Sequence, residues 1–496
     1  MRWVTLGVRV VVAGALCCVA GAAGAADVAG GGHATGVVGA GGATGGTTAG
    51  GAAITAGMVG ATSAASAVGI ASAAAVTGAA PVGAALRARG LGVPFEGTPG
   101  PGNAITDVPG VEVGQVTQVS GDGPLKIGTG PVRTGVTVVL PRGRTSADSV
   151  YGGFFDLNGN GELTGQAYLQ DFGVVIGPIG ISNTNAIGQV YAGIQQWTQE
   201  KFKLAATPVV AETWDGRLND IGGFHVQPAD AIAAIEVART GPVAEGNVGG
   251  GTGMVCFGFK GGIGTASRKV SVGGKDYVVG VLVQCNTGDR ETLRIAGAPV
   301  GPELSKAWLP CYDPALSAPD KLPKCKAEAA AGARGAATGA ATEHTRGNTV
   351  GNISGDATAG HPPPDVGSII IVVATNAPLM PVQLNRIARR AALGMGRLGS
   401  YSGNQSGDLM MSFTTASAAA NDPDQTHPSA VTPLASDNLD PLFKAVVEAT
   451  EESVVNALVA AQTMTGIDGY RFYSLPHAQL GAILKRYGRL EGGHSP

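Results

Sequence analysis

Two hydrophobic patterns alternate along most of the chain. Short, continuous apolar runs are typical of strands buried on both faces, and they occupy residues 135–140, 277–284 and 368–375. Amphipathic runs with helical spacing open at a residue suited to the first helical turn, namely Pro228, Pro381, Pro441 and Pro476. The alternation predicts a layered α/β enzyme rather than a β-sandwich or a helical bundle.

Two low-complexity segments interrupt this pattern. From residue 27 to about residue 90 the chain is almost entirely Gly, Ala, Thr, Ser and Val, with no aromatic side chain. Such a composition cannot bury a core that offsets the entropy of ordering. We therefore predict a disordered spacer over residues 27–95. A similar stretch at about 327–364 predicts an insertion in a mobile surface loop.

The first 26 residues have the features of an export signal. Arg2 and Arg9 give a positive start, residues 10–22 form a short apolar core, and residues 23–25 are small, as a cleavage site requires. The apolar core is too short to span a bilayer comfortably, which disfavours an uncleaved membrane anchor. We expect a secreted or periplasmic protein. The net charge of −3 gives no sign of a nucleic-acid partner.

Four cysteines remain beyond the predicted signal peptide. Export makes disulfides possible, and Cys311 and Cys325 bracket a Pro-rich loop, so these two are the better candidates for a pair. Cys256 and Cys285 lie in apolar runs, which predicts buried free thiols. No CxxC spacing occurs, so a structural zinc site is not expected.

Two glycine-rich segments resemble ligand-binding loops. Residues 156–161 resemble the first half of a calcium loop, but the twelfth position, which needs a bidentate Glu, holds Ala167. We read the segment as a turn that presents Glu162, either as a surface charge or as a ligand for an amine. Residues 246–264 lack the Gly-Lys-Ser/Thr end of a phosphate loop. Their glycines instead favour close backbone approach in a hairpin or a site loop.

A serine nucleophile without a histidine is the most informative catalytic candidate. The chain has no G-x-S-x-G motif, and several of its seven histidines lie in low-complexity or terminal positions. A serine can instead use its own α-amine as base once the preceding peptide bond is cut. That amine titrates near 7.7–8.0, close to working pH. Gly367 and Ser368 meet the need for a small residue, a loop before it and a strand after it.

Residues from about 103 to 489 resemble the DmpA/β-aminopeptidase family, peptidase family S58. The segments that carry the resemblance follow the family's order: NAITDVPGVEVGQVT, VRTGVTVVLPRG, LNGNGELTG, GPIGISNTNAIGQVY, AETWDGRLND, GGGTGMVCFGFKGGIGTASR, VGVLVQCNTGDRETLRIAG, GSIIIVVATNAPL and GRLGSYSGNQSGDLMMSFTTAS. The resemblance implies a precursor that cuts itself between Gly367 and Ser368 into an α chain, 96–367, and a β chain, 368–496. It also implies a four-layer αββα sandwich like that of N-terminal nucleophile hydrolases.

Family members remove N-terminal residues from small peptides, amides and esters, some with D- or β-amino acids. The resemblance implies no metal or organic cofactor, and homo-oligomers of αβ heterodimers, often tetramers. It assigns Ser368 as nucleophile, with Ser406 and Asp408 beside it to relay or orient protons. Asn286 is implied as the amide donor to the oxyanion. Taken alone, Ser406 and Asp408 would be a turn and Asn286 a strand-ending cap.

The resemblance also implies two substrate-binding residues. Glu162 matches a carboxylate that holds the substrate's ammonium group, and Trp214 lies where some members have a Tyr that donates to the oxyanion. Two rival functions remain at this point. One is a self-processing acyltransferase of the ornithine acetyltransferase type, which uses Thr where this chain has Ser368. The other is a non-catalytic exported protein that retains the fold.

Overall fold

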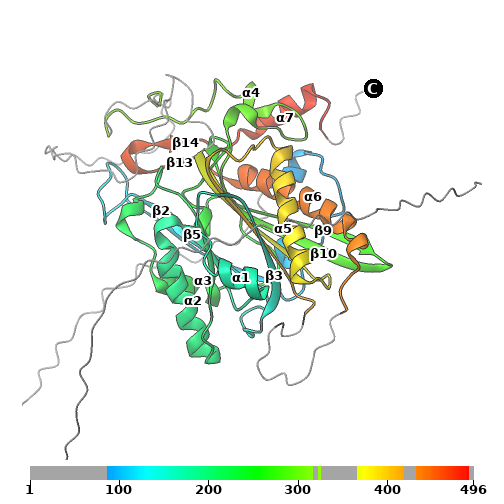
Figure 1. Ribbon diagram of the computed structural model, residues 1–496. Coiled ribbons are helices and arrows are strands. Elements are labelled where there is room, and N and C mark those ends of the chain that lie inside the picture. Colours follow the sequence, from blue (N-terminus) through cyan, green and yellow to red (C-terminus); the bar gives the residue numbers. More distant parts are fainter. Residues whose placement is uncertain (1–85, 317–321, 326–365, 418–419, 421–431, 491–496) are drawn as a thin grey trace, which may run out of the picture. The chain divides into compact units, whose positions relative to one another are not determined.

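The computed structural model describes residues 86–316, 322–325, 366–417, 420 and 432–490 (Figure 1). All of them belong to one of the two compact units of the chain, residues 78–496. The predicted signal peptide, the predicted spacer up to residue 85 and the predicted insertion at 327–364 lie outside the described residues. Within the described part, no helix has the length and hydropathy needed to cross a membrane.

Two β-sheets form the centre of this unit. The four-stranded sheet has the order β1 (Glu112–Ser120), β2 (Val132–Leu140), β5 (Ile179–Asn183) and β6 (Val209–Thr213). The six-stranded sheet has the order β4 (Val174–Val175), β3 (Val150–Gly159), β12 (Gln405–Thr414), β11 (Val366–Thr375), β10 (Lys275–Asn286) and β9 (Gly262–Val272). Strand β11 runs parallel to β12 and antiparallel to β10, so it lies in the interior of its sheet.

Helices cover the outer face of each sheet (Figure 1). Helices α2 (Ile187–Phe202) and α3 (Pro228–Glu236) pack on the four-stranded sheet, and α5 (Pro381–Arg397) and α6 (Asp440–Ala460) pack on the six-stranded sheet. Proline occupies the first turn of α3, α5 and α6, as the sequence pattern predicts. The other α-helices of the described residues are α1 (Gln166–Phe172), α4 (Val300–Glu303) and α7 (His477–Arg486).

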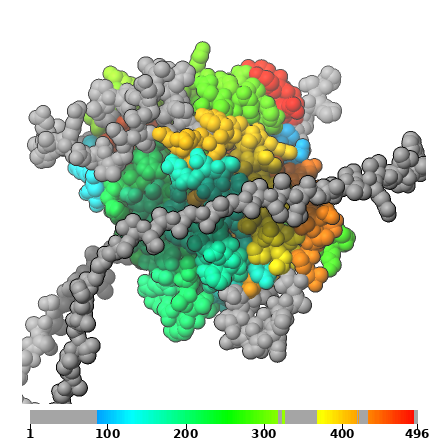
Figure 2. Space-filling model, in the orientation of Figure 1, coloured from blue at the N-terminus to red at the C-terminus, as the bar shows by residue number. Residues whose placement is uncertain are grey.

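The hydrophobic core has three layers, one between each pair of adjacent structural layers. Strand β11 shows this most clearly, because its successive side chains point to opposite faces. Ile369, Ile371 and Val373 face α5 and α6, whereas Ile370 and Val372 face the four-stranded sheet. Figure 2 shows this face of the unit in the same orientation, where the yellow residues of α5 and the orange residues of α6 lie side by side. The predicted αββα sandwich is therefore confirmed.

The predicted spacer extends too far toward the folded part of the chain. Residues 86–95 belong to the folded unit, with a 3-10 turn at Ala88–Leu91 and with Ala88 and Val93 fully buried. The Arg89 guanidinium donates to both carboxylate oxygens of Glu452 on α6, at 2.8 Å each. The larger and charged side chains of residues 86–95 thus hold these residues against the folded unit.

One of the two cysteine predictions is confirmed and the other is wrong. Cys311 and Cys325 form the predicted disulfide. Cys256 and Cys285, predicted as buried free thiols, form a second disulfide instead, with 5.5 Å between their Cα atoms. Both are fully buried, so the apolar surroundings were read correctly. The error arises because a short hairpin brings Cys256 against the end of β10, a contact that local sequence does not reveal.

Candidate active site

Ser368 lies where three strands bring the predicted catalytic residues together. In the register of the six-stranded sheet, Ser368 is opposite Asn286 of β10 on one side and Gly407 of β12 on the other. Gly367 pairs with Ser406 in the same way. Ser368 is 4% exposed, so its hydroxyl is withdrawn from bulk water.

The Gly367–Ser368 peptide bond is shaped by close packing. Ser368 Oγ donates a hydrogen bond to the carbonyl oxygen of Gly367 at 2.7 Å, which places the hydroxyl beside the carbonyl that it would attack. A Cβ atom at position 367 would overlap the carbonyl oxygen of Asn286. Gly367 does not have a positive φ. The glycine is thus required for space rather than for unusual backbone angles.

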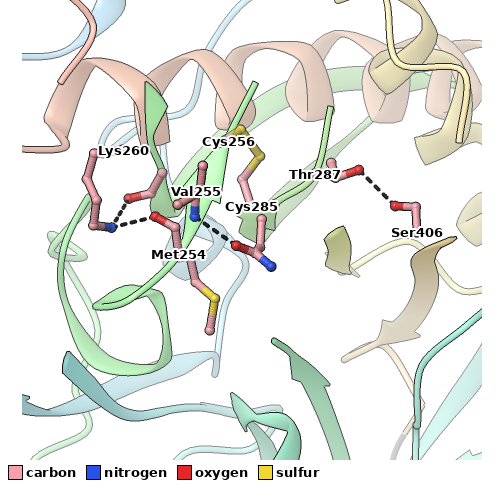
Figure 3. The surroundings of a disulfide bond; sticks show 9 residues. Met254, Val255, Cys256, Lys260, Cys285, Thr287 and Ser406 are labelled. Carbon is pink, nitrogen blue, oxygen red and sulfur yellow. Dashed lines mark hydrogen bonds between the residues drawn. A yellow bond between two sulfur atoms is a disulfide. The ribbon is translucent and has the colours of Figure 1, made fainter. Parts of the chain in front are cut away.

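A chain of hydroxyl groups ends on a buried carboxylate of β12, the strand next to that of Ser368. Ser406 Oγ donates to Asp408 Oδ1 at 2.7 Å, and Ser402 Oγ donates to Asp408 Oδ2. Thr287 Oγ1 lies 2.9 Å from Ser406 Oγ (Figure 3), and it is the donor because the Ser406 proton points to Asp408. Ser406 and Asp408 share one face of β12, as their spacing predicts. Sequence reasoning missed Thr287 and Ser402, although each lies within a segment that carries the family resemblance.

The side-chain amide of Asn286 is held in one orientation. Its Oδ1 accepts from the backbone N–H of Val255 at 2.7 Å, and its Nδ2 donates to the carbonyl oxygen of Trp214 at 2.8 Å. An amide nitrogen has two protons, so Nδ2 keeps a second donor. The geometry suits the predicted donor to an oxyanion formed at Ser368, the residue opposite Asn286 in the sheet.

Two carboxylates lie on the other side of the site. Glu162 is exposed, and its backbone N–H donates to Glu212 Oε1 at 3.1 Å. Burial raises the pKa of Glu212, hydrogen bonds from Thr184 Oγ1 and the Glu162 N–H oppose this, and the nearby Glu162 carboxylate raises the pKa further. The turn before Glu162 packs directly on Gly407, the β12 partner of Ser368. Sequence reasoning missed Glu212, two residues before Trp214.

Trp214 contributes to the site through its backbone. Its carbonyl oxygen accepts the Asn286 amide, while the side chain is 39% exposed and its ring lies against Gly216. The predicted contact between the indole and a substrate stays a prediction.

Two ionisable side chains, Asp215 and Lys260, are fully buried near the residues that hold Asn286. Burial raises the pKa of Asp215 to about 7, and hydrogen bonds from Thr134, Asn219 and Asn183 oppose that rise. Burial also lowers the pKa of Lys260 well below its usual value, against the attraction of Asp215. Lys260 Nζ donates to the carbonyl oxygens of Met254 at 2.7 Å and Gly261 at 2.8 Å (Figure 3).

These contacts close the hairpin formed by β7 (Val255–Cys256) and β8 (Phe259–Lys260). The hairpin lies within the glycine-rich segment 246–264, where close backbone approach was predicted.

The comparisons with known proteins agree with this geometry. Residues 103–472 match the model of peptidase family S58. The chain is 49% identical over 406 residues to a beta-peptidyl aminopeptidase of Sphingosinicella microcystinivorans, covering 82% of this chain and 93% of that one.

Two solved structures share the fold. The L-aminopeptidase D-Ala-esterase/amidase of Ochrobactrum anthropi, described as a variant of the Ntn hydrolase fold, has a TM-score of 0.67 and 39% identity, and the match covers 82% of this chain and 99% of that one. A Burkholderia sp. beta-aminopeptidase has a TM-score of 0.65 and 37% identity, over 83% of this chain and all of the other. From its sequence, its fold and the arrangement of its candidate site, the chain belongs to peptidase family S58.

Proposed function

We propose that this chain is a self-cleaving serine aminopeptidase that uses Ser368 first to cut itself and then to hydrolyse substrates. The observation that carries the proposal is the meeting of Ser368, Asn286 and the Ser406–Asp408 pair on three adjacent strands. Membership of a peptidase family makes the chain a hydrolase of the aminopeptidase type and does not favour the acyltransferase alternative. The roles of the individual residues are what we propose.

The proposed maturation step converts an amide into an ester. Ser368 Oγ adds to the Gly367 carbonyl carbon, and its proton goes to the amide nitrogen of Ser368 as the C–N bond breaks. Gly367 is then joined to Ser368 through an ester. Water hydrolyses this ester, leaving a carboxylate on Gly367 and a free α-amine on Ser368. The 2.7 Å contact between Oγ and the Gly367 carbonyl oxygen supports this step.

The new amine then serves as the base in substrate hydrolysis. It accepts the Oγ proton while Oγ attacks the substrate carbonyl, and it returns a proton to the departing amine. Water cleaves the resulting acyl-enzyme in the same manner. The second N–H of Asn286 stabilises the oxyanion of each tetrahedral intermediate. Because Ser406 pairs with Gly367 in the sheet, we propose that the Ser406–Asp408 pair orients the new amine.

Glu162 and Glu212 give the proposed selectivity for free N-termini. A substrate ammonium group near both carboxylates relieves their mutual repulsion and forms charge-assisted hydrogen bonds. The substrates we propose are small peptides, amides and esters with a free amine. Because two relatives, at 49% and 46% identity, are named beta-peptidyl aminopeptidases, we include substrates with an N-terminal β-residue.

Assembly and location are further parts of the proposal. The family resemblance supports a homo-oligomer of αβ heterodimers, which light scattering of the purified protein tests directly. Residues 1–26 support export to the periplasm or the medium. Fractionation of producing cells checks this, and activity confined to the cytoplasm contradicts it.

Intact mass and N-terminal sequencing of the purified protein test the function. We expect two chains, the smaller beginning Ser-Ile-Ile-Ile at Ser368, and release of an N-terminal residue from a β-homoamino acid amide. A single uncut chain that hydrolyses no amide would contradict the proposal. The variant Ser368→Ala is the matched control, because it should remain uncut and inactive.

A further inference from the structure

We propose that the Cys256–Cys285 disulfide positions the Asn286 amide, so that substrate turnover depends on this bond. The inference rests on the proposed role of Asn286 as oxyanion donor. Neither cysteine touches the reacting atoms, so both are positioning residues.

Three successive residues of the β7–β8 hairpin are tied to three successive residues at the end of β10. The Val255 N–H donates to Asn286 Oδ1 at 2.7 Å, and the Phe257 N–H donates to the Thr287 carbonyl oxygen at 2.7 Å. Cys256 lies between these two donors in the chain, and its disulfide to Cys285 is shown in Figure 3. The covalent bond thus fixes the backbone donor that orients the Asn286 amide.

The other contacts of the hairpin do not tie this part of it to β10. Lys260 closes the hairpin on its own backbone, through the carbonyl oxygens of Met254 and Gly261, so it holds the Met254–Val255 peptide within the hairpin. Arg290 donates to the Gly258 carbonyl oxygen, which lies at the turn of the hairpin, three residues after Val255. The disulfide joins the residue after Val255 to the residue before Asn286, so it is a covalent constraint on the distance between Val255 and that amide.

The same hairpin also bears on the hydroxyl chain. Phe257 holds the backbone of Thr287, and Thr287 Oγ1 lies 2.9 Å from Ser406 Oγ. Releasing the hairpin therefore disturbs the site on two sides of Ser368. A misplacement of about 1 Å in a catalytic group can cost about 100-fold in rate, so a small shift is sufficient.

A double alanine variant with a matched control tests the proposal. Cys256 and Cys285 are fully buried, so substitution is a cleaner perturbation than a reducing agent. The variant is C256A/C285A, and the control is C311A/C325A, which removes a disulfide whose Cys311 pairs with Arg471 rather than with β10. Both are assayed for self-cleavage, melting temperature, kcat and KM, well below their melting temperatures.

We expect C256A/C285A to lower kcat by about 10-fold or more with KM changed by less than about threefold, since a misplaced oxyanion donor weakens transition-state binding. The control should keep the wild-type kcat even if its melting temperature falls. Asn286→Ala should lower kcat by about 10²–10³ in the wild type and by about 10-fold less than that in the C256A/C285A background, because the disulfide variant has already lost that part of the Asn286 contribution. A kcat within twofold of the wild type, or full additivity with Asn286→Ala, overturns the proposal.

A second variant decides the matter if C256A/C285A does not fold. Val255→Pro removes the N–H donor but leaves the disulfide intact, and proline is tolerated at the first residue of a strand. It should lower kcat by a similar factor, and a wild-type kcat overturns the proposal. If the wild type cleaves itself but releases no amino acid, the proposed function fails and this inference fails with it. An active wild type with an unaffected variant overturns this inference alone.

Discussion

The two sides of the candidate site are built in different ways. On the side of Asn286, Ser406 and Asp408, every group is at least 95% buried. Asn286 is held by hydrogen bonds with Val255 and Trp214, and Ser406 donates to Asp408 on the same strand. On the side of Glu162 and Glu212, one carboxylate is exposed and only the other is buried. The first side is arranged to fix reacting atoms in place, whereas the second can admit a charged group from solvent.

This difference predicts which kinetic constant each substitution affects. Groups that interact with the transition state alone change kcat, whereas groups that bind the substrate and the transition state equally change KM. Substitutions on the buried side should therefore lower kcat, and substitutions of the two glutamates should raise KM for substrates with a free amine.

The largest effect is expected from Ser368→Ala. Without Oγ the chain has neither a nucleophile to cut the Gly367–Ser368 bond nor one to attack a substrate, so we expect an uncut protein without measurable turnover. Gel electrophoresis and mass spectrometry check the first point and an amide assay the second. Normal cleavage in this variant would refute the assignment of Ser368.

Asn286→Ala should be next in size. Loss of an oxyanion donor should lower kcat by about 10²–10³, with little change in KM. Steady-state kinetics of the matured protein measure this effect. A rate within twofold of the wild type would remove Asn286 from the site.

Asp408→Asn should have a somewhat smaller effect on the same side. The buried carboxylate accepts from both Ser402 and Ser406, and its loss disturbs the hydroxyl chain that orients the proposed base. We expect kcat to fall by about 100-fold, at the lower end of what proton-transfer groups contribute. If KM rises instead while kcat is unchanged, Asp408 belongs with the substrate-binding side.

The sequence predicted the buried side better than the exposed side. The apolar runs at 277–284 and 368–375 predict strands without any knowledge of their partners, and the resemblance places Asn286 and Ser368 at their ends. The Cys256–Cys285 bond was misread because it depends on a tertiary contact across 29 residues. Glu212 was missed because its importance arises from packing against the Glu162 turn, which no local pattern encodes.

Glu162→Gln should produce a moderate change confined to substrates with a free amine. An exposed ion pair contributes about 1 kcal/mol, which corresponds to a KM increase of about fivefold. An ester with a blocked N-terminus is the matched control and should be hydrolysed as in the wild type. Equal losses on both substrates would contradict a role in ammonium binding.

The smallest effect, and the most specific, is a pH dependence of KM set by Glu212. Burial and the neighbouring Glu162 carboxylate raise the pKa of Glu212, so its protonated, neutral form gains as pH falls at values where an ordinary glutamate stays charged. We expect KM for free-amine substrates to rise severalfold as pH falls through this raised pKa.

Glu212→Gln should abolish that rise in KM, because no charge is left to lose. Glu162→Gln should keep the rise but move its midpoint to lower pH, because the repulsion that favours the neutral form of Glu212 is gone. Titration of the Ser368 amine affects kcat, so the two constants must be measured separately across the pH range. An unchanged midpoint in Glu162→Gln would mean that the two carboxylates do not interact and do not form one ammonium-binding site.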